Sequence, residues 1–253
     1  MPERIDMIEA SVEYEVWGAG APRIVMLHDG LGSIAQWRDT PAELADRTGV
    51  AVMAYNRPGH GGSTPVPTGP WPTLWLHDQA RLLARLLEEL DIPDPFLVGH
   101  SDGGSIALLH ASSGGACRGV VALAPHSFVE PVCVSAISAM RADPSRIIRS
   151  LGAHHADPAA VFEAWSGVWV SDEFGRWDIR DRLAEISCPT LVVQGDADDY
   201  ATDHQLRSTV DAIGEPASGQ LLPGVGHLIH HQRVDLVVDL VAVAFVAAVG
   251  RTG

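Results

Sequence analysis

The chain has 253 residues, and its formal charge is −15, from 17 Lys and Arg against 32 Asp and Glu. This length is typical of one α/β domain or of such a domain with a modest insertion. The negative charge would repel phosphate backbones and anionic lipid surfaces, so we expect neither nucleic acid nor membrane as a partner.

Three cysteines, Cys117, Cys133 and Cys188, show no Cys-x-x-Cys spacing. Their odd number and spacing favour reduced thiols over a disulfide framework, and hence a cytoplasmic protein. Residues 1–10 contain acidic side chains and no apolar run, so we expect no secretory signal. The apolar run 236–249 is interrupted by an aspartate and is shorter than the roughly 20 residues that span a bilayer, which predicts a helix with a buried face.

Strand-like and helix-like segments alternate along the first half of the chain. Residues 5–17 alternate apolar and polar side chains before a Gly/Pro-rich turn, which predicts an antiparallel edge strand or hairpin. Continuous apolar runs predict buried strands, and helical periodicity predicts the helices between them. The strands are expected at 23–27, 50–55 and 96–99, and the helices at 34–47, 74–90 and 101–111.

The same alternation returns near the C-terminus, with strands at 120–124, 190–193 and 221–222 and helices at 203–213 and 233–249. It predicts an α/β fold with a mostly parallel, doubly wound sheet and helices on both faces. In such sheets the ligand site lies at the carboxyl ends of the strands.

Residues 128–182 interrupt this alternation with several helix-like pieces and no convincing strand. The block holds Trp165, Trp169 and Trp177, and it lies between two predicted strands. We therefore expect a core of residues 1–127 and 183–253, with residues 128–182 inserted as a small helical cap over the strand ends.

Ser101 lies at the junction of a predicted strand and a predicted helix, in the sequence Gly-His-Ser-Asp-Gly. A serine at such a sharp turn adopts a strained backbone conformation, and the flanking glycines permit the close strand-to-helix crossing. This context is that of the nucleophile elbow, so Ser101 is the predicted nucleophile.

A serine hydroxyl needs an adjacent base that is itself held by a third group. His227, which follows Gly-Val-Gly after the last strand, is the predicted base. The acid should follow a strand and precede this histidine, which indicates Asp198, with Asp196 and Asp199 as alternatives in the same acidic cluster. The acid would fix the imidazole tautomer and stabilise the imidazolium.

Backbone N–H groups of Gly30 and Asp102 are the expected donors to a developing oxyanion. His28 is expected to support the loop that contains Gly30. Four residues are candidates for a substrate pocket, although the tryptophans could equally form the core of the cap: Leu31, His126, Trp165 and Trp169.

Motifs for cofactors and metals are not recognisable in the sequence. No Gly-x-Gly-x-x-Gly follows a strand, there is no phosphate loop, and the adjacent His154 and His155 would point apart on a helix. We therefore expect no cofactor and no metal.

Together these segments resemble the α/β-hydrolase superfamily over essentially the whole chain. The matching motifs are the loop His28-Asp29-Gly30-Leu31-Gly32, the loop 57–63, the elbow around Ser101, the acidic turn 195–198 and Gly226-His227. The resemblance implies an eight-stranded core, a cap after the sixth strand, and Ser101, Asp198 and His227 as the catalytic triad.

Within this superfamily the sequence favours a carboxylesterase or lactonase acting on a small ester or lactone. Carbon–carbon bond hydrolases often have asparagine before the nucleophile and tryptophan soon after the histidine, where this chain has His100 and residues 228–231. Similar folds with an aspartate nucleophile are excluded by Ser101. Carbon–carbon hydrolysis, cofactor-free perhydrolase activity and a non-catalytic ligand receptor remain as alternatives, and the sequence predicts no oligomeric state.

Overall fold

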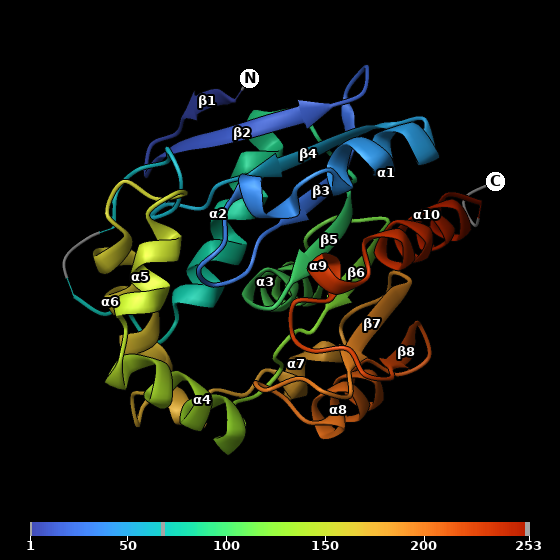
Figure 1. Ribbon diagram of the computed structural model, residues 1–253. Helices are drawn as coiled ribbons and strands as arrows, with labels where there is room; N and C mark the ends of the chain where they lie inside the picture. The colour runs from blue at the N-terminus through green and yellow to red at the C-terminus, as the bar shows by residue number, and fades with distance from the viewer. Residues whose placement is uncertain (1, 67–68, 251–253) are drawn as a thin grey trace.

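Eight strands form one sheet through the centre of the molecule (Figure 1). The structure is a computed structural model that describes residues 2–66 and 69–250. In chain order the strands are β1 (Glu3–Asp6), β2 (Ser11–Trp17), β3 (Pro22–Leu27), β4 (Ala51–Tyr55), β5 (Phe96–His100), β6 (Gly119–Leu123), β7 (Thr190–Gly195) and β8 (Ala217–Leu222).

The order across the sheet is β1-β2-β4-β3-β5-β6-β7-β8. The β1–β2 and β2–β4 pairings are antiparallel, and all the others are parallel. The predicted mostly parallel α/β sheet of eight strands and the N-terminal antiparallel hairpin are therefore confirmed.

Helices cover both faces of the sheet because its central strands are apolar on both sides. Every residue of β4, β5 and β6 is buried. Ile24 and Met26 of β3 belong to a core with α1 (Thr40–Thr48) and α10 (Val234–Gly250), which pack together. Val25 and Leu27 face the opposite core, which includes side chains from three helices: α2 (Trp75–Glu89), α3 (Asp102–Ser112) and α8 (Asp203–Ile213).

Two predicted elements differ from the structure in their extent, and one element of the structure was not predicted. The single helix expected over 34–47 is wrong, since a 3-10 helix η1 (Ile34–Trp37) ends at Arg38, whose φ of 51° breaks the helix before α1 begins. The strand β8 is longer than expected because β7 pairs with its polar first half. The short helix α9 (Ile229–Gln232) was not predicted.

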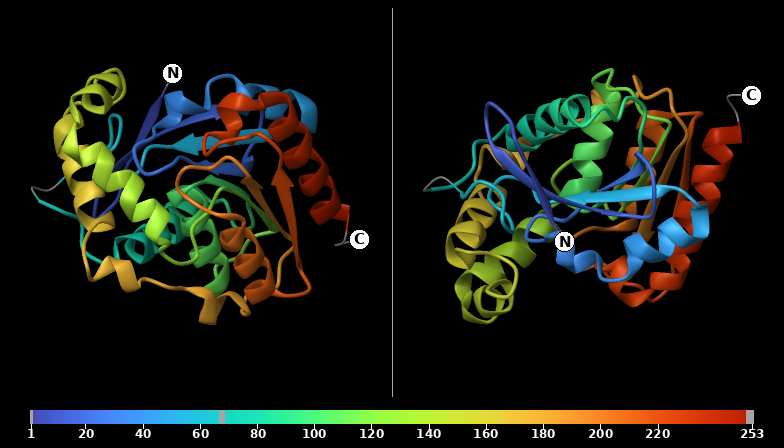
Figure 2. Two further views of the ribbon diagram at one scale, coloured as in Figure 1. Left: turned by 60° about the horizontal axis from the view of Figure 1, so that its bottom comes forward. Right: turned by 90° about the horizontal axis from the view of Figure 1, so that it is seen from above.

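Between β6 and β7 the chain forms α4 (Pro131–Ala142), α5 (Ser145–Leu151), α6 (Pro158–Trp169), the 3-10 helix η2 (Phe174–Arg176) and α7 (Arg180–Leu183). Helices α4–α6 gather at one side of the molecule, away from α10, in each view of Figure 2. The two ends of this helical block run side by side, since Phe128 and Asp178 form an antiparallel bridge and the Ile179 N–H donates to the Ser127 carbonyl at 2.8 Å. The domain boundaries at 127 and 183 stay a prediction.

None of the helices in residues 2–66 and 69–250 combines the length and apolar character needed to cross a bilayer.

Candidate active site

The carboxyl ends of the central strands meet at one edge of the sheet. Leu27 of β3 pairs with Gly99 of β5, and His100 pairs with Leu123 of β6. The segments that follow these strands line a cavity of about 390 Å³, together with side chains of α4–α6. The candidate site therefore lies between the sheet edge and the helical block.

Ser101 occupies a strained turn directly after β5. Its φ of 52° and ψ of −120° are unusual for a residue with a Cβ, and its N–H donates to the Leu123 carbonyl at 2.8 Å. The flanking glycines leave no room for a side chain, because a Cβ at Gly99 would collide with the Gly103 carbonyl and one at Gly103 with the Leu27 carbonyl. The backbone thus has the form expected of a nucleophile elbow.

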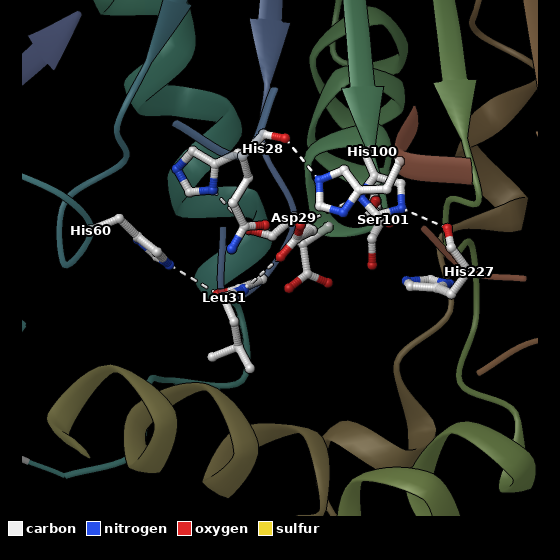
Figure 3. A network of polar contacts seen from close by, with 12 residues as sticks. His28, Asp29, Leu31, His60, His100, Ser101 and His227 are labelled. Carbon is white, nitrogen blue, oxygen red and sulfur yellow. Dashed lines mark hydrogen bonds and ion pairs between the residues drawn. The ribbon is translucent and has the colours of Figure 1, made fainter. Parts of the chain in front are cut away.

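His227 and Asp198 are joined by a hydrogen bond of 2.8 Å between the imidazole Nδ1 and the carboxylate Oδ2. With Nδ1–H donating to the carboxylate, Nε2 keeps its lone pair and can accept a proton. The ring of His227 and Ser101 both line the cavity and approach one another in Figure 3. No hydrogen bond joins the two side chains in the described part of the chain; in empty sites such bonds are often long and shorten when substrate binds.

The Asp198 carboxylate is held from several directions. Gln194 Nε2 donates to Oδ2, and the Tyr200 N–H donates to Oδ1 at 2.7 Å. Burial raises the pKa of Asp198, but the hydrogen bond and electrostatic interaction with His227, together with the Tyr200 N–H, outweigh it, so the pKa lies below its ordinary value. The alternatives Asp196 and Asp199 are exposed, and Asp196 accepts a hydrogen bond from the Gly224 N–H instead.

In the loop after β3, the Gly30 N–H differs from the N–H groups of the next two residues in its hydrogen bonding. The Leu31 N–H donates to Asp29 Oδ1 at 3.0 Å, and the Gly32 N–H to the Asp29 carbonyl at 3.2 Å, whereas the Gly30 N–H makes no hydrogen bond with the described residues. Arg57 Nη2 donates to the Asp29 carbonyl at 2.6 Å. Because a peptide group is planar and trans, fixing this carbonyl points the Gly30 N–H the opposite way.

Histidines brace the same loop. His60, labelled in Figure 3, has its Nε2 2.9 Å from the Gly30 carbonyl. His155 Nε2, from the helical block, lies 2.9 Å from the Leu31 carbonyl. His28 contributes as expected of a loop support, since its Nε2 accepts from the Arg57 N–H at 3.1 Å.

Asp102, at the start of α3, has a buried carboxylate beside the predicted nucleophile. Its Oδ2 accepts a hydrogen bond of 2.9 Å from Trp165 Nε1, while Oδ1 has no partner among the described residues. Burial raises the pKa of Asp102 to about 6, against the opposing charge of Arg57. Gly30 lies against this contact, where a Cβ would collide with both Trp165 and Asp102.

All four predicted pocket residues, Leu31, His126, Trp165 and Trp169, line the cavity. Burial lowers the pKa of His126 to about 3, so this ring is neutral at ordinary pH. From the helical block, the sequence predicted the two tryptophans of the lining but not its aliphatic residues. The aliphatic lining from the block is Ile137, Met140, Ile147 and Leu151.

A further polar cluster joins three segments that are far apart in sequence: Asp29, His100 and His230. His100 Nε2 lies 2.9 Å from the His227 carbonyl, which ties the elbow to the loop that contains the predicted base. No sequence pattern indicates this cluster, because its members come from distant segments and share no local spacing.

The chain matches the model of the alpha/beta hydrolase family over residues 24–240. Non-heme chloroperoxidase CPO-A1 of Kitasatospora aureofaciens is 29% identical over 245 residues, which cover 83% of each chain. The 2-succinyl-6-hydroxy-2,4-cyclohexadiene-1-carboxylate synthase of Salmonella agona (strain SL483) is 36% identical over 104 residues, 40% of this chain and 38% of that enzyme. The crystal structure of proline iminopeptidase from Mycobacterium smegmatis has a TM-score of 0.74 over 99% of this chain and 100% of its own, at 20% identity.

The family match extends over most of the chain, and the sheet has the mostly parallel order that the sequence motifs implied. From both lines of argument, the chain belongs to the alpha/beta hydrolase family.

Proposed function

We propose that the protein is a serine hydrolase that cleaves a small, neutral ester or lactone through an acyl-enzyme. Ser101 would be the nucleophile, His227 the general base and Asp198 the residue that orients it. The observation that supports this most is the 2.8 Å hydrogen bond from His227 to the buried Asp198 at the wall of the cavity that Ser101 also lines.

In the first half of the reaction, the Ser101 hydroxyl attacks the carbonyl carbon while His227 Nε2 takes its proton. The carbonyl oxygen becomes an oxyanion, to which the N–H groups of Gly30 and Asp102 can donate. Collapse of this intermediate breaks the bond to the alcohol oxygen, and His227 returns the proton to that oxygen. In a lactone the alcohol stays attached to the acyl group.

In the second half, a water molecule attacks the acyl carbon and His227 takes a proton from it. The bond to Ser101 then breaks, the serine recovers its proton from His227, and a carboxylic acid leaves. Asp198 stabilises the imidazolium in both halves, and its lowered pKa keeps it ionised for this purpose at neutral pH.

The lining of the cavity supports a neutral, largely apolar acyl group. The block contributes Ile137, Leu151, Trp165 and Trp169, and the volume of about 390 Å³ is that of a small-molecule site. An acyl group of this kind is bound through burial of its apolar surface rather than through ion pairs.

A fluorophosphonate probe tests the proposal directly, because it reacts with a serine only where a base activates the hydroxyl. We expect covalent labelling of Ser101, found by peptide mass spectrometry, and turnover of short-chain esters or lactones. Ser101→Ala should abolish both, while Ser113→Ala, at the exposed end of α3, should retain both. Absence of labelling at Ser101 in the unsubstituted protein would contradict the proposal, and labelling without turnover of any ester or lactone would favour a ligand receptor.

Perhydrolase activity is a second candidate, favoured by the likeness to the non-heme chloroperoxidase along 83% of both chains. In the second half, hydrogen peroxide would attack the acyl carbon in place of water. The bond from the acyl group to Ser101 would then break, and the acyl group would leave as a peroxy acid. Peroxy acid formation from a short carboxylic ester and peroxide, compared with ester hydrolysis by the same preparation, separates the two. Carbon–carbon hydrolysis is less well supported, since His100 and residues 228–231 stand where asparagine and tryptophan are often found in such enzymes.

A further inference from the structure

Asp29, His100 and His230 direct oxygen and nitrogen atoms toward one buried point (Figure 3 shows Asp29 and His100). One ligand-type atom from each residue lies within 4.8 Å of the other two. His100 is fully buried and His230 is 2% exposed, yet Nδ1 of each ring has no hydrogen-bond partner among the described residues. Unpaired polar atoms at such depth are rare, and they need a partner of some kind.

The hydrogen bond of His100 to the His227 carbonyl determines which ring nitrogen carries the hydrogen, and it leaves no donor between His100 and Asp29. Its Nε2 lies 2.9 Å from the His227 carbonyl, which can only accept, so Nε2 carries the hydrogen. In a neutral ring, Nδ1 is then a lone pair, and it faces Asp29 Oδ2 at 3.5 Å. Two acceptors that face one another in a buried place need a donor or a cation between them. A water molecule that donated to both at about 2.8 Å would hold them roughly 4 Å or more apart, so the 3.5 Å separation favours a proton or a metal ion.

The separation of the two atoms distinguishes these cations. A proton shared in a charge-assisted N–H···O bond brings nitrogen and oxygen to about 2.7–2.9 Å. Two ligands of a tetrahedral zinc ion, each about 2.0–2.1 Å from the metal, lie roughly 3.3 Å apart. The observed 3.5 Å is close to the second value and clearly longer than the first.

The surroundings of His100 also match those of a metal ligand. A histidine bound to a metal almost always donates its other ring N–H to a carbonyl or carboxylate, and His100 does so to the His227 carbonyl. The second oxygen of Asp29 is likewise held, since Oδ1 accepts from the Leu31 N–H at 3.0 Å. Two imidazoles and one carboxylate are a donor set that suits Zn²⁺ and neighbouring divalent transition metals.

We propose that Asp29, His100 and His230 form a binding site for one divalent transition-metal ion, for which Zn²⁺ is the probe. Asp29 also lines the cavity, so an ion held here has a route of entry and a side left open to water. The ion would connect the loop with Gly30, the elbow with Ser101 and the segment with His227. The proposal does not depend on what Ser101 does.

The test is a titration of chelator-treated protein with Zn²⁺ by isothermal calorimetry, together with elemental analysis after dialysis. Co²⁺ provides an independent readout, because its visible absorption reports the ligands directly. We expect one ion per chain, and a loss of affinity of more than about 100-fold in both Asp29→Asn and His230→Gln, since loss of an outer partner alone costs 10–100-fold.

Two controls fix the interpretation. His231→Gln removes the neighbouring imidazole, which bonds to the Gln36 carbonyl and is outside the cluster, and it should bind Zn²⁺ as the unsubstituted chain does. Ser101→Ala should also bind normally, so failure of the proposed hydrolase chemistry leaves this test intact. Circular dichroism checks the fold, and if Asp29→Asn fails to fold, His230→Gln decides. Absence of stoichiometric binding, or equal binding by the cluster variants, would overturn the proposal.

Discussion

Two buried carboxylates flank Ser101, and their surroundings differ in kind. Asp198 accepts hydrogen bonds from His227, Gln194 and the Tyr200 N–H, which favour its ionised form. Asp102 accepts one from Trp165, and its burial outweighs the opposing charge of Arg57 and raises its pKa to about 6. The two residues are therefore expected to respond to substitution in opposite ways.

For Asp198→Asn we predict a fall in kcat of about 10⁴-fold, because an amide holds the wrong tautomer of the imidazole. Steady-state kinetics on an ester substrate measures the change. Asp196→Asn and Asp199→Asn are matched controls at exposed positions and should keep kcat near that of the unsubstituted protein. Near-normal turnover by Asp198→Asn would assign the orienting role to one of these neighbours.

For Asp102→Asn we predict a gain in stability that depends on pH. The pKa of about 6 in the folded chain exceeds the ordinary 3.8, so between these values the folded state binds more protons and the free energy of unfolding falls as pH rises. The substitution removes this cost, which amounts to at most about 3 kcal/mol at pH 8 and falls to about 0.5 kcal/mol at pH 4. Urea unfolding at both pH values measures it, with Asp46→Asn, on the exposed face of α1, as control. An equal difference at the two pH values would contradict the assignment.

At this scale the sequence predicted residues with a local signature and missed those without one. Ser101 follows a strand and lies between glycines, and His227 follows a glycine-rich turn, so their neighbours indicate their positions. Asp29, His100 and His230 have no such pattern, because the fold alone brings their three segments together. The sequence did not predict the Asp102–Trp165 hydrogen bond for the same reason, since this bond joins two distant segments, α3 of the core and α6 of the helical block.

Among the elements, the crossing of β5 into α3 leaves no room for an added side chain. Gly103 of α3 approaches β3 so closely that an added Cβ would meet the Leu27 carbonyl. We predict that Gly103→Ala destabilises the fold by about 1–3 kcal/mol or more, as overpacking does, measured by urea unfolding. Gly175→Ala is the control, since nothing lies within 4 Å of its added Cβ. Equal stability of the two variants would show that α3 can shift without cost.

The sequence predicts the fully buried strands more accurately than the exposed ones. β4, β5 and β6 are buried throughout, and their continuous apolar runs identify them without help from neighbours. β8 has the polar sequence Ser-Gly-Gln, and pairing with β7 rather than local preference makes it a strand. The helix breaks at Arg38 because this residue has a positive φ, and no glycine at this position indicates the break in the sequence.

For the whole molecule, the charge of −15 predicts how substrates approach. A cationic ester should be attracted, so its kcat/KM should fall several-fold as ionic strength rises from about 10 to about 150 mM and the screening length shortens from about 30 to about 8 Å. A neutral ester of the same shape is the control and should respond little. Equal salt dependence of the two esters would show that charge near the cavity mouth cancels the overall field.

The antiparallel bridge between Phe128 and Asp178 has a consequence for how this fold can diversify. The bridge holds the two ends of the helical insertion together. The insertion is therefore attached to the sheet at the same two points, whatever sequence lies between them. Exchange of the intervening helices would replace the aliphatic and tryptophan side chains that line the cavity. Ser101 and the Asp198–His227 pair would keep their contacts with the core. Selection on this lineage could therefore change which substrates bind while the residues proposed to react stay in place.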